Sequence, residues 1–378
     1  MNLSLRNSLF FVILLLAPAS SLFGQRYHIS YAPNSQEGLM LQLIEQLDGA
    51  PKLQQMEEFL KRWPNHPSVP WIYSFMQERF AKENNLDKSL ESGAKLLELF
   101  PDDLEAAVLN QKTALQKGDQ AQIEKWTLVA TKAAEKLVGS PKPFYVTQQD
   151  WDKRLAYAGS LISQEEYGIF KKGIEAEKPS DQVKALDELI SKYPNSVYAV
   201  QALPYLLRAH RALGNTQRAL EIGEKLLAKD MNNEEAILTV AQTWLDRRSN
   251  YPRVLTLSNR LLMLGQSTSK PDSYSIDDWN KRKAFFSGAA YQMIGTANVF
   301  QNNFAEADRA FRAAMPFIKG NVQAEGSALF YLGWSNYYME KYKEAAVFFR
   351  QCMSLQSPFK DQALKQLDGM RRERRIVE

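Results

Sequence analysis

Small and aromatic residues recur at the spacing of one helix face in the C-terminal part of the sequence. Ala345, Phe349 and Cys352 stand at positions i, i+4 and i+7, and Ala307 begins the same small, aromatic, small order 38 positions earlier. Residues at these separations share one side of an α-helix, so the pattern predicts amphipathic helices. Alternating apolar and polar positions, which would indicate strands, do not occur over any convincing stretch. We therefore predict an all-α chain.

The middle of the sequence repeats itself over a longer distance. Leu90–Leu97 returns 130 positions later as Leu220–Leu227, with six of eight residues identical. The segment 150–154, Asp-Trp-Asp-Lys-Arg, returns at 278–282 as Asp-Trp-Asn-Lys-Arg, and a Lys-Pro pair precedes both copies. Because these matches follow one another in the same order, they predict a tandem internal duplication.

The duplicated positions run over 38–157 and 168–285, and a divergent third segment follows them. We divide the chain accordingly into a signal peptide at 1–24, a first copy of helical repeats at 25–157, a second copy at 158–285, two C-terminal hairpins at 286–357, and a capping helix with a basic tail at 358–378.

The last two hairpins carry a specific combination of residues. Leu332-Gly333 precedes the Ala345, Phe349, Cys352 face, and Ile294-Gly295 precedes the equivalent face one hairpin earlier. This combination resembles the tetratricopeptide repeat, a unit of about 34 residues with Leu-Gly in its first helix and Ala, Phe and Ala in its second. The resemblance covers most of 38–357. It implies a right-handed α-solenoid that binds proteins or peptides, without a cofactor, through its concave surface.

A second resemblance concerns Tyr193-Pro194-Asn195-Ser196. Hairpins ending in this order are similar to repeats of the outer-membrane barrel-assembly lipoproteins and of periplasmic cell-division coordinators. The motif itself is a helix stop followed by a new helix start. The resemblance implies an alternative role in envelope assembly or cell-wall coordination, although the chain lacks the cysteine to which a lipid anchor would be attached.

The first 24 residues have the order of a secretory signal. Arg6 precedes the apolar run Leu9–Ala17, and small residues lead to Gly24. We expect cleavage after Gly24 or, as a second option, after Ala19. The alternative of a retained anchor is disfavoured because the apolar run has nine residues, whereas a membrane-spanning helix needs roughly 20. The sequence thus predicts export to the periplasm or the extracellular space, without stable membrane insertion after cleavage.

Composition excludes several kinds of chemistry. One cysteine and three histidines in 378 residues rule out internal disulfides, cysteine-based zinc sites and a His-Glu-x-x-His pair. The net charge of +4 is spread along the chain and does not indicate a nucleic-acid partner. Nucleophile-elbow and phosphate-loop motifs are absent as well. We predict a protein that is not an enzyme and that uses no metal or cofactor, with an enzyme of unrecognised site as the least favoured alternative.

The candidate binding residues are aromatic. Phe330, Trp334, Tyr337 and Tyr338 occupy positions of the last first-helix that packing does not require, and Phe300 occupies such a position one hairpin earlier. Rigid aromatic rings on a groove provide contact area at low entropic cost, which favours a peptide site. The alternative, which we favour, is that the C-terminal helix caps the array and covers these rings.

Two further sets of residues are weaker candidates. Arg208 and Arg211 could hold an acidic segment or a terminal carboxylate, although a solvated helix face is the favoured explanation. The repeated Asp-Trp-x-Lys-Arg segments could form a paired recognition element, but a structural role at a helix start is favoured. A homo-oligomer is compatible with this sequence, since exposed aromatics at the end of an array can pair with a second copy.

Overall fold

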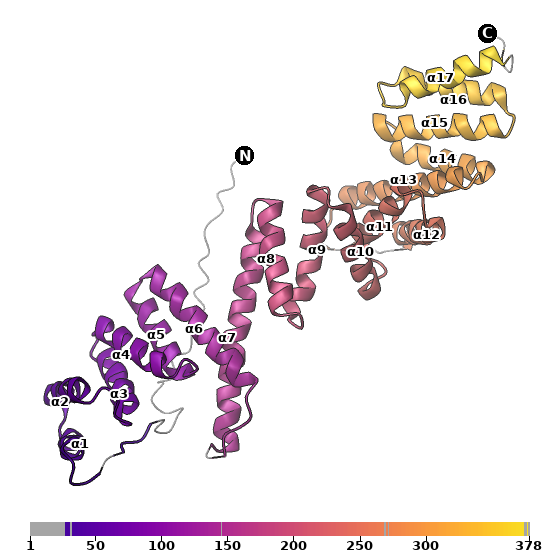
Figure 1. Ribbon diagram of the computed structural model, residues 1–378. Helices are drawn as coiled ribbons and strands as arrows, with labels where there is room; N and C mark the ends of the chain where they lie inside the picture. The colour runs from indigo at the N-terminus through magenta and orange to yellow at the C-terminus, as the bar shows by residue number, and fades with distance from the viewer. Residues whose placement is uncertain are drawn as a thin grey trace. The chain divides into compact units, whose positions relative to one another are not determined.

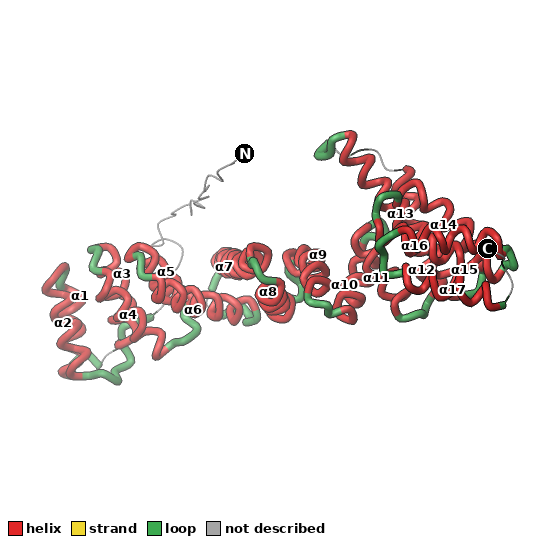
Figure 2. Tube along the Cα trace, turned by 90° about the horizontal axis from the view of Figure 1, so that it is seen from above, coloured by secondary structure: helices red, strands yellow, loops and turns green. Residues whose placement is uncertain are grey.

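The computed structural model describes residues 27–30, 32–144, 146–267, 270, 272–373 and 376. The predicted signal peptide and most of the basic tail lie outside the described residues. Within them the chain forms seventeen helices and no strand (Figure 2). The prediction of an all-α fold built from helical hairpins is therefore confirmed.

Contacts divide the chain into two compact units, the first ending at Gly168 and the second beginning at Ile169. The first unit contains α1 (Gln36–Gln46), α2 (Gly49–Arg62), α3 (Val69–Lys82), α4 (Leu86–Leu99), α5 (Leu104–Lys117), α6 (Gln120–Val138) and the beginning of α7 (Gln148–Glu175). The second unit contains the end of α7 and α8 (Pro179–Lys192), α9 (Val197–Ala212), α10 (Thr216–Lys229), α11 (Glu234–Asp246), α12 (Tyr251–Ser267), α13 (Ile276–Phe300), α14 (Phe304–Ile318), α15 (Val322–Tyr338), α16 (Tyr342–Ser354) and α17 (Lys360–Arg372).

Six helix pairs are joined by a short turn that contains a left-handed residue. We call the first helix of each pair the A helix (α3, α5, α9, α11, α13 and α15) and the second the B helix (Figure 1). Just after each A helix one residue adopts the left-handed conformation, which ends the helix and reverses the chain. These six residues are Asn84, Gly118, Gly214, Arg248, Asn302 and Glu340. Backbone bonds spanning five residues close five of these turns, as from the Asn85 N–H to the Phe80 carbonyl (2.8 Å) and from Lys341 to Asn336 (2.9 Å). The turn after α5 is closed by the Gly118 N–H, which donates to the Ala114 carbonyl (3.0 Å).

The internal duplication seen in the sequence is also seen in the order and spacing of the helices. Each helix from α2 to α6 has a counterpart from α8 to α12 that starts 128 to 131 positions later. The left-handed residues correspond too, with Asn84 matched by Gly214 and Gly118 by Arg248. Arg248 keeps the turn although a side chain disfavours that conformation. The predicted segment boundaries at 157/158 and 285/286 fall inside α7 and α13.

These two long helices begin with the repeated Asp-Trp-x-Lys-Arg segment. The Asp150 N–H donates to Thr147 Oγ1 (3.1 Å), and the Asp278 N–H donates to Ser275 Oγ (3.0 Å), so both starts are capped alike. Trp151, immediately after the capped aspartate, is buried. The matching start of both helices fits the structural role that the sequence favoured.

The arginine of the segment makes an equivalent contact in both copies. Arg154 lies 3.7 Å from Glu105 at the start of α5, and Arg282 bonds to Glu234 at the start of α11. Each pair therefore ties the beginning of a long helix to the A helix two elements earlier. Trp279 is buried near the start of the second long helix and completes this anchor.

A glycine allows close approach of A and B helices in both copies, but its neighbours differ. In the first copy Gly93 faces Gln77 and Asn110, whose side chains bond to each other (Gln77 Nε2 to Asn110 Oδ1, 3.0 Å). Gln77 also donates to the Ala106 carbonyl at 2.9 Å. The first copy thus fills the glycine groove with a buried polar network.

The second copy fills the same groove with apolar groups. Leu207 and Val240 stand at the positions of Gln77 and Asn110, shifted by 130. A methyl group added to Gly223 would lie 2.7 Å from Val240 Cγ2 and 3.9 Å from Leu207 Cδ1. One backbone arrangement is therefore maintained by polar bonding in one copy and by packing in the other.

The apolar core of the second unit continues from hairpin to hairpin. Phe300 packs against the cluster formed by α7–α13 and against the next cluster of α13–α15. Tyr331 and Trp334 likewise contact the last two clusters, which end with Ala363, Leu367 and Met370 of α17. The final helix thus covers the apolar side of the last hairpin, as Figure 1 shows.

We predict that Gly223→Ala destabilises the second unit by about 1–3 kcal/mol, because the new methyl group overpacks the contact with stiff, β-branched Val240. Chemical unfolding followed by circular dichroism measures the change. Val240→Ala should relieve the clash, so the double variant should be more stable than the sum of the two single effects predicts.

Gly265→Ala serves as the matched control, since its added methyl group would meet its nearest atom at 3.5 Å, an ordinary contact. This variant should unfold like the parent or be up to about 1 kcal/mol more stable. Equal effects of the two glycine substitutions would show that close approach at Gly223 does not limit the fold.

Candidate protein-interaction surface

Five rings lie together where α13, α14 and α15 meet in the second unit. We call Phe300, Phe304, Tyr331, Trp334 and Tyr338 the aromatic surface. Four are half-buried, and Tyr338 is 50% exposed. The A helices α13 and α15 supply four of the five rings, and the helix-to-helix turn after α13 places Phe304 beside them.

The exposed end of this surface is held by stacking. The rings of Phe304 and Tyr338 are nearly parallel, 7° apart in plane, with their centroids separated by 4.6 Å. Trp334, one helical turn before Tyr338, lies 5.3 Å from the Tyr338 ring. Stacked rings have few alternative orientations, so this part of the surface is ordered before a partner arrives.

The other end carries a positive charge. The Arg248 guanidinium lies over the Phe300 ring at 5.1 Å, and Phe300 meets Tyr331 edge-on at 6.5 Å. Burial raises the pKa of Tyr331 above its ordinary value, and Arg248 partly opposes the change. The Tyr331 hydroxyl is therefore neutral at physiological pH and can act as a hydrogen-bond donor.

Phe330 does not belong to this surface, contrary to the prediction. It is 6% exposed, and its ring lies 5.5 Å from Phe359 and 5.9 Å from Phe349. The segment leading into α17 closes over the ring, and B helix α16 packs on its other side. Phe330 is therefore a core residue.

Tyr337 is half-buried and bonded to the end of the capping helix. Its hydroxyl donates to Glu373 Oε2 at 3.0 Å, and its ring contacts Tyr342 edge-on at 5.7 Å. The sequence left two alternatives, rings covered by a C-terminal cap and rings exposed for a partner, and each applies to different rings. The C-terminal segment covers Phe330 and Tyr337, whereas Tyr338 stays exposed.

The predicted arginines share a carboxylate. Arg208 Nε lies 2.8 Å from Glu235 Oε2, and Arg211 Nη1 lies 3.7 Å from Glu235 Oε1. Glu235 lies in the first turn of α11, the next A helix, so the pairs join adjacent hairpins. At least half of each arginine side chain is exposed. An external carboxylate would compete with Glu235, at low cost because exposed ion pairs contribute about 0–1 kcal/mol.

His210, between these arginines in sequence, faces the interior. Its side chain is 4% exposed, and its Nδ1 lies 3.4 Å from Asn215 Nδ2. Burial lowers the pKa of His210, nearby Asp187 opposes this shift, and Arg218 adds to it. The imidazole is thus a neutral core group.

Groups that could bind a metal do not converge in the part of the chain that the structure describes. No set of three or more His, Cys, Asp and Glu residues is placed there to hold a metal ion. Cys352 is fully buried and donates to the Gly326 carbonyl at 3.3 Å, and burial raises the pKa of its thiol. None of the described helices combines the length and apolar content needed to cross a bilayer.

The comparison with protein families matches the last hairpin. The tetratricopeptide repeat model aligns with residues 327–355, which comprise most of α15 and all of α16. The chain contains a tetratricopeptide repeat. The resemblance predicted from Leu332-Gly333, Ala345, Phe349 and Cys352 is confirmed for this hairpin.

Solved structures similar to this tetratricopeptide repeat chain include three of low identity. "MamA 41-end from Desulfovibrio magneticus RS-1" is 18% identical, over 51% of this chain and 94% of its own, with a TM-score of 0.37. A tetratricopeptide repeat protein from Parabacteroides merdae is 12% identical, over 70% and 97%, with a TM-score of 0.29. A human IFIT1 dimer with PPP-AAAA is 14% identical, over 94% and 91%, with a TM-score of 0.34. No curated protein sequence matches the chain.

The sequence did not point to two residues of the aromatic surface, Phe304 and Tyr331, or to Arg248 beside it. Phe304 and Tyr331 stood at positions that the repeat pattern assigns to packing, and Arg248 ends an A helix more than 50 residues before Phe300. The sequence did contain a signal for Phe304. An aromatic residue, Phe304 or Tyr342, stands at the first position of both C-terminal B helices, α14 and α16. The contact of Arg248 with Phe300 depends on the stacking of hairpins and had no local signal.

We predict that His210 makes the second unit less stable in mild acid. The pKa of His210 is lowered in the folded chain, so the unfolded chain binds more protons as the pH falls through and below the ordinary histidine pKa of about 6.5. The stabilisation is present above that pH and lost below it. His210→Gln should lose less unfolding free energy than the parent between about pH 7.5 and about pH 5.5. Identical pH profiles from urea unfolding would contradict this assignment.

Proposed function

We propose that this chain is an exported, non-enzymatic tetratricopeptide repeat scaffold that binds a protein or peptide segment. The aromatic surface on α13–α15 is the proposed contact site, and four of its five rings lie on the A helices, which line the concave side in this type of repeat. The observation that carries the proposal is the stacked pair of Tyr338 and Phe304, with Tyr338 half exposed beside Trp334.

The chemistry of the surface favours a peptide with apolar and acidic character. Trp334 and Tyr338 offer ring faces and edges to aliphatic or aromatic side chains. Arg248, over Phe300 at the other end, offers a charged donor to a carboxylate. A short segment with an apolar anchor followed by an acidic residue would satisfy both ends.

Export is the second part of the proposal, and it rests on the order of residues from Arg6 to Gly24. An envelope-assembly or cell-wall coordination role is the alternative form of the same scaffold function. The Tyr193–Ser196 motif that suggested it acts as a helix boundary here, since α8 ends at Lys192 and Ser196 Oγ caps α9 by accepting from the Tyr198 N–H (3.1 Å). The identity of the captured partner distinguishes the two forms.

We predict that Trp334→Ala combined with Tyr338→Ala weakens partner binding at least about tenfold, because truncating aromatic anchors costs more than about 1.4 kcal/mol of binding free energy. The partner is first captured from the envelope fraction of the source organism, and its affinity is then measured by titration calorimetry with purified components. The helical content should stay unchanged.

Tyr167→Ala is the matched control, because Tyr167 of α7 is 49% exposed and Tyr338 is 50% exposed. This variant should bind like the parent. Phe330→Ala should instead lower thermal stability, since its ring is core. Equal affinity of the parent and the double variant would remove the aromatic surface from the proposal, and collapse of the double variant's melting transition would assign its rings to the core.

Export generates a separate prediction. Expressed in its source organism, the mature protein should begin at Gln25, or at Ser20 if the second cleavage option is used, as measured by intact mass and N-terminal sequencing of the exported fraction. Leu14→Arg places a charge in the middle of the apolar run and should leave the full-length precursor inside the cell. A parent chain that still starts at Met1 would contradict export.

A further inference from the structure

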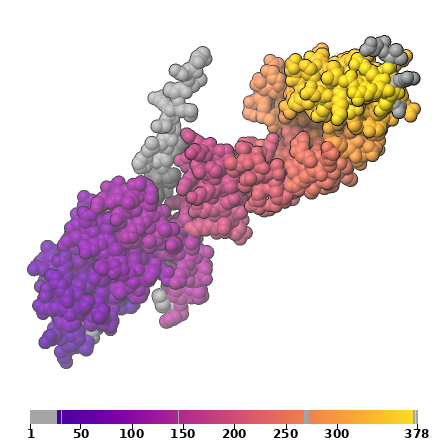
Figure 3. Space-filling model, turned by 45° about the horizontal axis from the view of Figure 1, so that its top comes forward, coloured from indigo at the N-terminus to yellow at the C-terminus, as the bar shows by residue number. Residues whose placement is uncertain are grey.

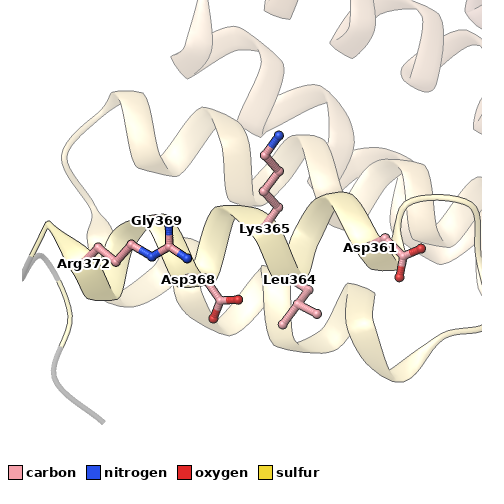
Figure 4. Close-up of a pocket in the computed structure, with 6 residues that line it drawn as sticks. All are labelled: Asp361, Leu364, Lys365, Asp368, Gly369 and Arg372. Atoms are coloured by element: carbon pink, nitrogen blue, oxygen red, sulfur yellow. The ribbon is translucent and has the colours of Figure 1, made fainter.

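The face of α17 that points away from α16 carries acidic, basic and apolar residues together. The described residues that line a shallow, open hollow here belong to α17, and Figure 4 shows their side chains along this helix. Figure 3 shows the C-terminal residues at one end of the second unit. The opposite face, with Ala363, Leu367 and Met370, is buried against the last hairpin. The residues of the hollow are Asp361, Leu364, Lys365, Asp368, Gly369 and Arg372.

The charges on this face are self-complementary in an antiparallel arrangement. Acidic Asp361 and basic Arg372 stand at the two ends, and basic Lys365 and acidic Asp368 stand between them. A two-fold axis midway between residues 366 and 367 would bring Asp361 opposite Arg372 of a second copy and Lys365 opposite Asp368. The four pairs named here, two of each kind, would then join opposite charges. An isologous contact requires this kind of self-complementarity.

Two apolar features complete the face. Leu364 is 41% exposed near the middle of the helix, although the helix buries other apolar residues. Gly369 lies in the helix interior, where glycine costs about 1 kcal/mol relative to alanine. Among the described residues, a methyl group there would meet no atom within 4 Å beyond its own stretch of helix. The packing of the described residues therefore does not require a glycine at this position.

The two-fold axis accounts for both the exposed Leu364 and the unexplained Gly369. Leu364 and Gly369 lie about 140° apart around the helix, at opposite edges of the face. Because the axis keeps equivalent residues at the same edge, the two Leu364 side chains would meet at one edge of the helix pair. At the other edge the two glycines would let the helix backbones approach closely.

We propose that α17 pairs antiparallel with α17 of a second copy of this chain, through the face centred on Lys365 and Asp368. Asp368, which also accepts from Arg371 at 3.2 Å in its own helix, would lie between that arginine and Lys365 of the second copy. The surface is separate from the aromatic surface, so the two proposals stand independently.

The pairing of two α17 helices is weak and reversible because the contact area is small. A helix of 13 residues is about 20 Å long, and one helix pair buries less area than a standard stable interface. We expect dissociation constants in the micromolar range or weaker, with dimerisation reduced as salt rises from about 0.05 M to about 0.5 M, because exposed charge pairs are screened.

Exchanging the charges of Lys365 and Asp368, one at a time and together, tests the proposed antiparallel pairing. Dimerisation is measured by sedimentation equilibrium on the mature protein, purified after any processing by the cell. Lys365→Glu places two like-charge contacts against Asp368, and Asp368→Lys places two against Lys365. Each should weaken dimerisation at least about tenfold. The double variant Lys365→Glu/Asp368→Lys restores opposite charges in this register and should return to within about threefold of the parent. Such restoration could not result from loss of folding.

Lys343→Glu on α16 is the control for net charge, since it makes the same charge change at an exposed site outside the face. It should dimerise like the parent. A chain that stays monomeric up to about 1 mM, single variants that dimerise like the parent, or a double variant as weak as the single ones would each overturn the proposal.

Discussion

Close approach of neighbouring helices is the constraint on which the rest of this structure depends. A single hairpin has an apolar side that it cannot cover alone, so each must pack against the next. Glycine and alanine on the B helices make that packing possible by admitting atoms of the adjacent A helix. The two copies show that the spacing, and not one particular set of contacts, is what the fold maintains: Gly93 faces an amide network, whereas Gly223 faces Leu207 and Val240.

The long helices α7 and α13 follow from the same stacking. Each begins at a capped Asp-Trp-x-Lys-Arg segment and ends packed against the following helix, α7 through Gly173 and Leu186 of α8, and α13 as the A helix of the pair with α14. One helix thus performs two tasks. Its beginning needs an anchor of its own, because a regular hairpin partner is not yet present there. The buried tryptophan and the ion pair with Glu105 or Glu234 provide this anchor. That division of tasks explains why the duplication boundaries read from the sequence fall inside helices.

The sequence revealed whatever is periodic and local, and it missed what depends on distant partners. Helix faces, the duplication and the Tyr-Pro-Asn-Ser boundary could be read because each is specified within a few residues. The burial of Phe330 depends on Phe359, 29 positions away, and the pairing of Arg208 depends on Glu235 in the next hairpin. A left-handed Arg248 or Glu340 had no signal either, since the turn geometry overrides the preference of the side chain.

The final helix determines which aromatic rings remain accessible. α17 and the segment before it pack on one side of the last hairpin, so they cover Phe330 and bond to Tyr337, and they leave Tyr338 beside Phe304 uncovered. A cap and an exposed aromatic face therefore coexist, because neighbouring residues of one helix point in different directions. Capping also gives α17 two unlike faces. One is apolar and buried, and the other alternates in charge around an exposed leucine, which is an arrangement that solubility alone does not require.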